Sequence, residues 1–232
     1  MKSKLLLALI LGFFSLGIAG LANATTLTFD TLPTSSAGGI SITNPFIEQG
    51  YLITPINGSS LAAFQEGWQS NRGSSNGTTY VGLFNGGHWD GSFQLKAFND
   101  SLFSITSIDL AEYFNSSDWG FGAAATQFVI TGDRNDGTQI SDSFNMDMIS
   151  DGVGNAPDFQ THLFSSSWTS LTSITITGTD TNGGPMGMPY VYFAFDNILL
   201  NESSVPVPEP ATLLLVGIGL MGLAGVRRKI QK

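Results

Sequence analysis

Cysteine is absent from the chain, so neither a disulfide framework nor a cysteine-based zinc site can form. A folded domain of this chain must therefore be held together by its hydrophobic core alone. Residues 25–204 provide 180 positions for that core, which is enough for one domain of ordinary size.

Basic residues are scarce in the middle of the chain. Residues 25–206 contain only Arg72, Lys96 and Arg134 against 17 acidic residues, which gives this stretch a net charge of −14. Such an acidic surface repels phosphate backbones, so nucleic acid is excluded as a partner. The same acidity attracts divalent cations.

Familiar catalytic motifs are also missing. The chain has two histidines, His88 and His162, and no thiol. Neither the G-x-S-x-G nucleophile elbow nor the H-E-x-x-H zinc motif occurs. Two carboxylates could serve a glycoside hydrolase or a lyase, but no pair stands out among 17 acids. The sequence therefore favours a non-catalytic protein, with a secreted polysaccharide-active enzyme as the alternative.

Helix signals are weak between residues 25 and 204, because Gly, Ser, Thr, Asn and Asp recur every few residues and favour turns. Between these turn residues lie short runs in which apolar and polar residues alternate. The clearest runs are 26–31, 79–84, 92–98, 102–114, 126–132, 138–144, 171–178 and 190–200. About ten short strands at this spacing predict an all-β fold, either an antiparallel β-sandwich or a jelly roll.

The first residues are typical of an export signal. Two lysines precede an uncharged apolar run over 5–21, and Ala22 and Ala24 then form an A-x-A cleavage site. This pattern predicts a secretory signal peptide over residues 1–24 and a mature chain that starts at Thr25. The alternative is an uncleaved anchor helix.

The end of the chain is a second apolar segment. After an extended, proline-rich linker that begins at residue 205, residues 211–226 carry no charge. As a helix this segment would be roughly 24 Å long, which is shorter than the ~30 Å hydrocarbon core of a bilayer. Arg227, Arg228 and Lys229 follow directly, and the positive-inside rule keeps such a cluster in the cytoplasm. The pattern predicts a short transmembrane helix over residues 211–226, through which the protein would contact the membrane.

The order of these features resembles a known family. The motif Val207-Pro208-Glu209-Pro210, the short glycine-rich helix and the basic cluster resemble the PEP-CTERM sorting signal of Gram-negative bacteria. The resemblance implies that an exosortase recognises the tail at the inner membrane and removes it, and that the protein then reaches the cell surface or the outside. It also implies a link to exopolysaccharide and biofilm. The alternative is a permanent single-span anchor.

The middle of the chain resembles, more loosely, the β-sandwich cargo domains that precede this tail. The likeness lies in "LTFD" near the mature N-terminus and "FAFDNILL" before the linker, and it implies an architecture without an activity. We therefore expect a signal peptide over 1–24, a β-sandwich over 25–204 and a sorting signal over 205–232. The expected role is that of a non-catalytic component of the envelope or extracellular matrix.

Three tryptophans lie in polar, glycine-rich segments that suit sugar binding. Trp68 and Trp119 are each flanked by polar residues, and Trp89 stands beside Asp90. A flat aromatic face near carboxylate and amide groups suits a pyranose ring, which has an apolar face and hydroxyl groups. These four residues are the candidate polysaccharide-binding residues. The alternative is that the tryptophans close the ends of the hydrophobic core.

Two aspartates form a candidate calcium site. Asp30 and Asp196 lie in the first and last predicted strands, and each follows a phenylalanine that should point inward. Because the first and last strands of jelly rolls often lie side by side, the two carboxylates could hold a structural Ca²⁺. The alternative is that both accept hydrogen bonds from turn amides.

A threonine array is a minor signal for ice binding. Thr175, Thr177 and Thr179 alternate along one predicted strand and therefore share a face. Ice binding requires a flat, regular array, and no neighbouring strand repeats the pattern in the sequence.

Overall fold

The fold is described by a computed structural model. It describes residues 24–35, 39–65, 76–86, 90–112, 123–149, 158–180 and 190–202. These residues contain fourteen β-strands and no helix, so the all-β prediction is confirmed for them. No helix in this part of the chain is long and apolar enough to cross a membrane. The predicted signal peptide, apart from Ala24, and the predicted helix over 211–226 lie outside the described residues.

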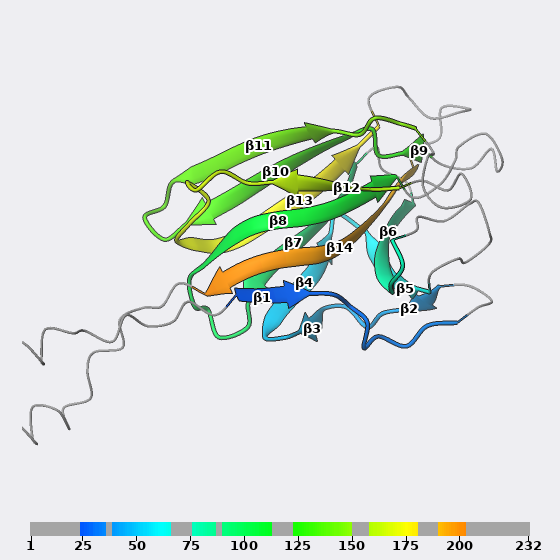
Figure 1. Ribbon diagram of the computed structural model, residues 1–232, viewed down its shortest axis with the longest axis horizontal. Coiled ribbons are helices and arrows are strands. Elements are labelled where there is room, and N and C mark those ends of the chain that lie inside the picture. Colours follow the sequence, from blue (N-terminus) through cyan, green and yellow to red (C-terminus); the bar gives the residue numbers. More distant parts are fainter. Residues whose placement is uncertain are drawn as a thin grey trace, which may run out of the picture. The chain divides into compact units, whose positions relative to one another are not determined.

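One layer, which we call sheet I, is built around the long strand β14. Strands β6 and β1 pair with one edge of β14, and β8 and β9 pair with its other edge. Sheet I continues through β5 and β2 beyond β6, and through β12 beyond β8 (Figure 1). Its strands are β1 (Ala24–Leu27), β2 (Ile40–Ser41), β5 (Ser60–Phe64), β6 (Tyr80–Gly86), β8 (Phe103–Glu112), β9 (Ala123–Ala124), β12 (Phe159–Leu163) and β14 (Tyr190–Glu202).

The second layer, sheet II, has the strand order β3-β4-β7-β13-β10-β11. Its strands are β3 (Phe46–Glu48), β4 (Tyr51–Ile56), β7 (Asp90–Ala97), β10 (Gln127–Arg134), β11 (Gln139–Asn145) and β13 (Leu171–Thr179). In the described part of the chain, the ladders of the two layers meet at one β-bridge, between Leu171 of β13 and Phe103 of β8. All strand pairs are antiparallel except β9 with β14.

The hydrophobic core lies between the two layers. Side chains alternate along each strand, so Phe193 and Phe195 of β14 point to the same face. Phe195 stacks on Phe93 of β7 with ring centroids 4.2 Å apart, and Phe193 meets Phe128 of β10 edge to face at 4.9 Å. Because these pairs join strands of different layers, the two sheets pack face to face as a β-sandwich. Burying one such ring contributes about 1.5–3 kcal/mol.

The sandwich has two ends that differ in what the chain does there. At one end, β14 finishes with Glu202 opposite Phe103, the first residue of β8; we call this the exit end. At the other end Phe193 lies opposite Glu112, the last residue of β8; we call this the loop end. The ten residues of β8 therefore run from the exit end to the loop end, over roughly 33 Å.

The threonines of β13 lie on the outer face of sheet II. Thr175 lies opposite Thr131 of β10, but Thr177 lies opposite Val129. On the other side, Gln94 of β7 lies opposite Thr175. In the described neighbouring strands, threonine therefore repeats at only one position, which does not favour ice binding.

Candidate functional site

A row of aromatic rings lies on the outer face of sheet I. Because Phe193 and Phe195 point into the core, Tyr192 points outward, and the register places it opposite Phe84 of β6. Successive ring centroids are 5.5 to 5.7 Å apart along the row. The row, which we call the aromatic row, runs Tyr192, Phe84, Phe64, Tyr80, Phe159.

Small residues make room for the aromatic row. Alanines stand beside it on three strands, at Ala62, Ala111 and Ala194, and together with the rings they form a second hydrophobic cluster outside the main core. Phe64 and Tyr80 are buried, whereas the other three rings are partly exposed. A face of partly exposed rings offers the apolar, flat contacts that a sugar ring or another planar apolar group needs.

The predicted tryptophans lie outside the described residues, but the strands that lead to their segments are described. Phe64 is the last residue of β5, four positions before Trp68. Phe84 in β6 precedes Trp89 by five positions. Trp119 precedes β9, which pairs with Val191 and Tyr192 of β14. The chain thus attaches all three tryptophan segments near members of the aromatic row.

The fourth candidate sugar residue, Asp90, is the first residue of β7 and lies opposite Thr179 of β13. It is half-buried. It stands on sheet II, whereas the aromatic row stands on sheet I, so the described residues do not bring Asp90 into the row. Of the predicted cleavage site, Ala24 is described: it is the first residue of β1 and lies opposite Asn201.

Asp30 and Asp196 both contact the short segment that precedes β6. Asp196 faces away from the core and is fully buried beneath that segment. Its Oδ2 accepts hydrogen bonds from Asn76 Nδ2 at 2.6 Å and from Thr78 Oγ1 at 2.8 Å. The exposed Asp30 accepts a hydrogen bond from the backbone N–H of Thr79 at 3.3 Å. The two aspartates therefore act on the same four-residue segment, and a calcium ion shared by them stays a proposal.

Burial dominates the electrostatics of this pair. It raises the pKa of Asp196 from 3.8 to about 6, while the hydrogen bonds from Asn76, Thr78 and the backbone of Asn197 act in the opposite direction. The nearby charge of Asp30 adds to the increase. A carboxylate that is hard to ionise is a weaker cation ligand near neutral pH, since the ion binds the deprotonated form.

A second group of carboxylates lies at the loop end. Carboxylate oxygens of Glu112, Asp147 and Asp158 lie within 4.8 Å of one another. Glu112 is only 3% exposed, and the three residues come from the end of β8, the segment after β11 and the residue before β12. No motif or spacing in the sequence connects these three residues, because only the pairing of the strands brings them together.

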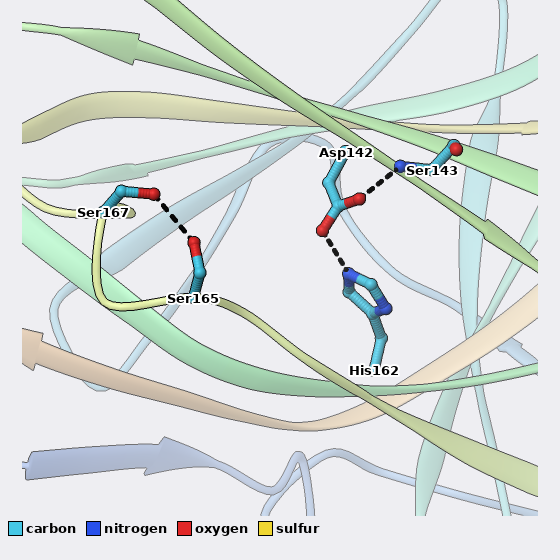
Figure 2. Close-up of polar contacts among 5 residues, drawn as sticks. All are labelled: Asp142, Ser143, His162, Ser165 and Ser167. Carbon is cyan, nitrogen blue, oxygen red and sulfur yellow. Dashed lines mark hydrogen bonds and ion pairs between the residues drawn. The ribbon is translucent and has the colours of Figure 1, made fainter.

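The two layers are also linked by a polar contact at their edge. His162 Nε2 of β12 and Asp142 Oδ2 of β11 lie 3.2 Å apart (Figure 2). The imidazole also packs edge to face against Phe164. A catalytic triad would need a hydroxyl on the other imidazole nitrogen. Ser165 instead pairs with Ser167 at 2.7 Å, and in the described part of the chain neither serine is bonded to His162.

The comparison with protein families concerns the tail. Residues 206–229 match the PEP-CTERM protein-sorting motif. The chain carries a PEP-CTERM sorting signal. The match includes every residue of the predicted motif and of the basic cluster, and it implies exosortase processing and export to the cell envelope or surface. None of the curated proteins compared with the chain matches it.

Several solved structures resemble the β-sandwich loosely. A family 29 carbohydrate binding module from Piromyces equi has 9% identity and a TM-score of 0.41, over 81% of this chain and 95% of the module. The CBM22-1 xylan-binding domain of Paenibacillus barcinonensis Xyn10C has 11% identity and a TM-score of 0.41, over 78% and 95%. An arabinose-bound α-L-arabinofuranosidase, MgGH51, has 13% identity and a TM-score of 0.41, over 80% of this chain and 27% of that one.

One member of the aromatic row, Tyr192, lies in a sequence pattern that indicates packing on both faces of its strand. In "YVYFAF", Tyr192 occupies one face of the strand while Val191, Phe193 and Phe195 occupy the other. A strand with aromatic residues on both faces predicts that its outer face also packs against something. Phe64 and Phe159 carry no such pattern, because they join the row only through strand pairing.

Proposed function

We propose that this protein is an exported, non-catalytic component of the envelope or extracellular matrix that contacts exopolysaccharide. The sorting signal takes it through the inner membrane, an exosortase removes the tail, and the β-sandwich reaches the cell surface or the outside. The aromatic row on sheet I is the contact surface for the polymer. The observation that carries this proposal is the row itself, together with the three tryptophan segments that leave the neighbouring strands.

The chemistry of the row suits a sugar polymer better than a charged partner. Its rings and alanines are uncharged. Residues 25–206 have a net charge of −14, which repels acidic partners. Neutral sugar rings bring apolar C–H faces that stack on aromatic side chains without bringing a charge into the contact. Successive rings 5.5 to 5.7 Å apart offer several such contacts along one polymer chain.

The test is retention of the exported protein on the host's own exopolysaccharide. Tyr192→Ala and Trp89→Ala should each weaken retention about tenfold or more, since residues that stack at binding sites often contribute more than about 1.4 kcal/mol. Phe98→Ala is the matched control, because Phe98 is 61% exposed and lies outside the row. A thermal melt of each variant shows that the fold survives. Unchanged retention in folded Tyr192→Ala and Trp89→Ala proteins would reject the proposal.

A polysaccharide-active enzyme is the second candidate, and the carboxylates at the loop end favour it. Retaining glycosidases use two carboxyl groups about 5–5.5 Å apart, and the oxygens of Glu112, Asp147 and Asp158 lie within 4.8 Å of one another. An enzyme would release reducing ends from the polymer and would lose this activity in Glu112→Gln. Release that depends on Glu112 would replace the binding proposal with the enzyme.

A further inference from the structure

A pocket lies at the exit end, beside the first half of β8. There the segment that follows β12 is hydrogen-bonded to β8 through the backbone. Phe164 N donates to Thr106 O at 3.0 Å, and Ile105 N donates to Trp168 O at 3.3 Å. Between this segment and β8 the surface is hollowed to about 380 Å³. That volume lies within the range of small-molecule sites.

Apart from the indole N–H of Trp168, the side-chain polar groups of the described lining are hydroxyls. They are contributed by Ser104, Thr106, Ser165, Ser166 and Thr169. Among the residues that the structure describes, no charged side chain lines the pocket, although residues 25–206 contain 17 acids. A cation would find no carboxylate in this lining, and the acidic domain repels an anion. Arg134, which contacts the same segment, does not line the pocket, and its guanidinium donates to the carbonyl of Ser167. The lining therefore matches a neutral ligand that is itself rich in hydroxyl groups.

The wall of the pocket is aromatic and well fixed. The ring centroids of Phe164 and Trp168 are 4.7 Å apart. Trp168 is only 2% exposed, so Phe164 packs against a buried side chain. Arg134 Nη2 donates to the carbonyl of Ser167 at 2.6 Å, and the Ser165 and Ser167 hydroxyls pair (Figure 2). A segment held in this way loses little conformational freedom when a ligand binds.

One hydroxyl is already oriented. Thr106 Oγ1 accepts a hydrogen bond from Asn201 Nδ2 at 3.0 Å, which leaves its proton to be donated elsewhere. Thr106 is exposed and lines the pocket, so a ligand hydroxyl can accept that proton.

We propose that this pocket binds one neutral pyranose residue, at the end or at a branch of a polysaccharide. The proposal takes its ligand class from the proposed function but not its residues. Ser104 and Glu112 are eight positions apart on β8, so the pocket is roughly 26 Å from the loop end. The protein would then hold carbohydrate at two separate places, which raises overall retention without any new contact between them.

The probes are the methyl glycosides of glucose, galactose and mannose, titrated into the exported protein and followed by calorimetry and by the indole N–H signal of Trp168. We expect saturable binding of at least one glycoside. Thr106→Val should weaken it about threefold to tenfold, as expected for one hydrogen bond. Phe164→Leu should weaken it as well. Thr172→Val is the matched control, because its hydroxyl bonds the carbonyl of Asp133 and does not line the pocket.

The outcomes separate this site from the aromatic row. No saturable binding of any of the three glycosides, or equal affinity in the wild type, Thr106→Val and Phe164→Leu, would overturn the pocket. If Phe164→Leu unfolds, Thr106→Val still decides, because it removes only an exposed hydroxyl. Loss of polymer retention in Tyr192→Ala with intact glycoside binding supports both sites. Loss of glycoside binding in Thr106→Val with normal retention in Tyr192→Ala supports the pocket and rejects the row.

Discussion

Asp109 of β8 and Asp196 of β14 lie directly opposite one another on the outer face of sheet I. Two like charges at such a position repel each other. Asn197 joins them: its side-chain Nδ2 donates to Asp109 Oδ2 at 2.9 Å, and its backbone N–H donates to Asp196 Oδ1 at 2.8 Å. The register between the two strands shifts immediately after Asp196, so the bridge lies at an irregularity of the sheet.

The Asn197 bridge gives the first prediction. Asn197→Asp replaces the donor between the two aspartates with a third carboxylate, so it should lower the free energy of unfolding by about 1–3 kcal/mol near neutral pH. Asn145→Asp is the control, because it adds the same charge while its oxygen can still accept the hydrogen bond from Gln127. Urea unfolding measures both variants. Equal losses in the two would show that only net charge matters.

The pH dependence of stability gives the second prediction. The folded protein binds the proton of Asp196 more tightly than the unfolded chain does, because burial raises the pKa from 3.8 to about 6. Protonation of Asp196 therefore stabilises the fold fully below its unfolded pKa of 3.8. As the pH rises through the folded pKa of about 6, the free energy of unfolding loses this contribution, which amounts to up to about 3 kcal/mol. Asp196→Asn cannot ionise, so its stability relative to the wild type should increase between about pH 4 and about pH 6.

The comparison variant for this experiment is Asp109→Asn, which removes the carboxylate that lies opposite Asp196 on the neighbouring strand. Urea unfolding across the same pH range measures all three proteins. A difference between Asp196→Asn and the wild type that stays constant with pH would contradict the prediction.

Calcium gives the third prediction. If Asp30 and Asp196 share a Ca²⁺, millimolar Ca²⁺ should raise the melting temperature by a few degrees more than Mg²⁺ does, since extracellular sites are weak and the gain is of the order of 1 kcal/mol. Asp30→Asn or Asp196→Asn should abolish that difference, whereas Glu112→Gln should preserve it. Equal melting curves in Ca²⁺ and in Mg²⁺ would contradict the calcium site. Both aspartates would then act only as hydrogen-bond acceptors for the segment before β6.

Processing gives the fourth prediction. Mass spectrometry of the protein recovered outside the cell should find a chain that starts near Thr25 and lacks residues 211–232. Cleavage after Ala24 would still leave three residues of β1 paired with β14, Thr25 opposite Leu200 among them. An extracellular species that keeps Arg227, Arg228 and Lys229 would favour a permanent anchor over a removable signal.

The core gives the fifth prediction. Gly178 of β13 has no room for a side chain, because an added Cβ would come within 2.7 Å of Phe193 and 3.0 Å of Ala125. Gly178→Ala should therefore cost about 1–3 kcal/mol of stability through overpacking. Gly91→Ala is a useful comparison, since its nearest atom is the flexible end of Leu83 at 2.6 Å. Thermal melts measure both, and an unaffected Gly178→Ala would show that the layers can separate there.

The strands could be predicted from the sequence because alternation is a local property. The runs over 92–98 and 190–200 correspond to β7 and β14, and Phe93, Phe193 and Phe195 lie in the core. Phe98, the residue after β7, is exposed instead. The sorting signal could be predicted for the same reason, since its three parts are contiguous. The aromatic row, the loop-end carboxylates and the pocket could not, because strand pairing brings together residues such as Glu112 and Asp158 that are far apart in the chain.

The position of β14 determines how the domain would bear a pulling force. The sorting signal begins at residue 206, four positions after the end of this strand, and the aromatic row includes Tyr192 near its start. If a polymer binds the row before an exosortase removes the tail, tension between the polymer and a tail still in the membrane would therefore run lengthwise along β14. Ladder hydrogen bonds lie perpendicular to the strands, so those that join β14 to β8, β6 and β1 would be sheared together rather than broken one after another. The strand that connects cargo to tail is thus the one best placed to resist extraction.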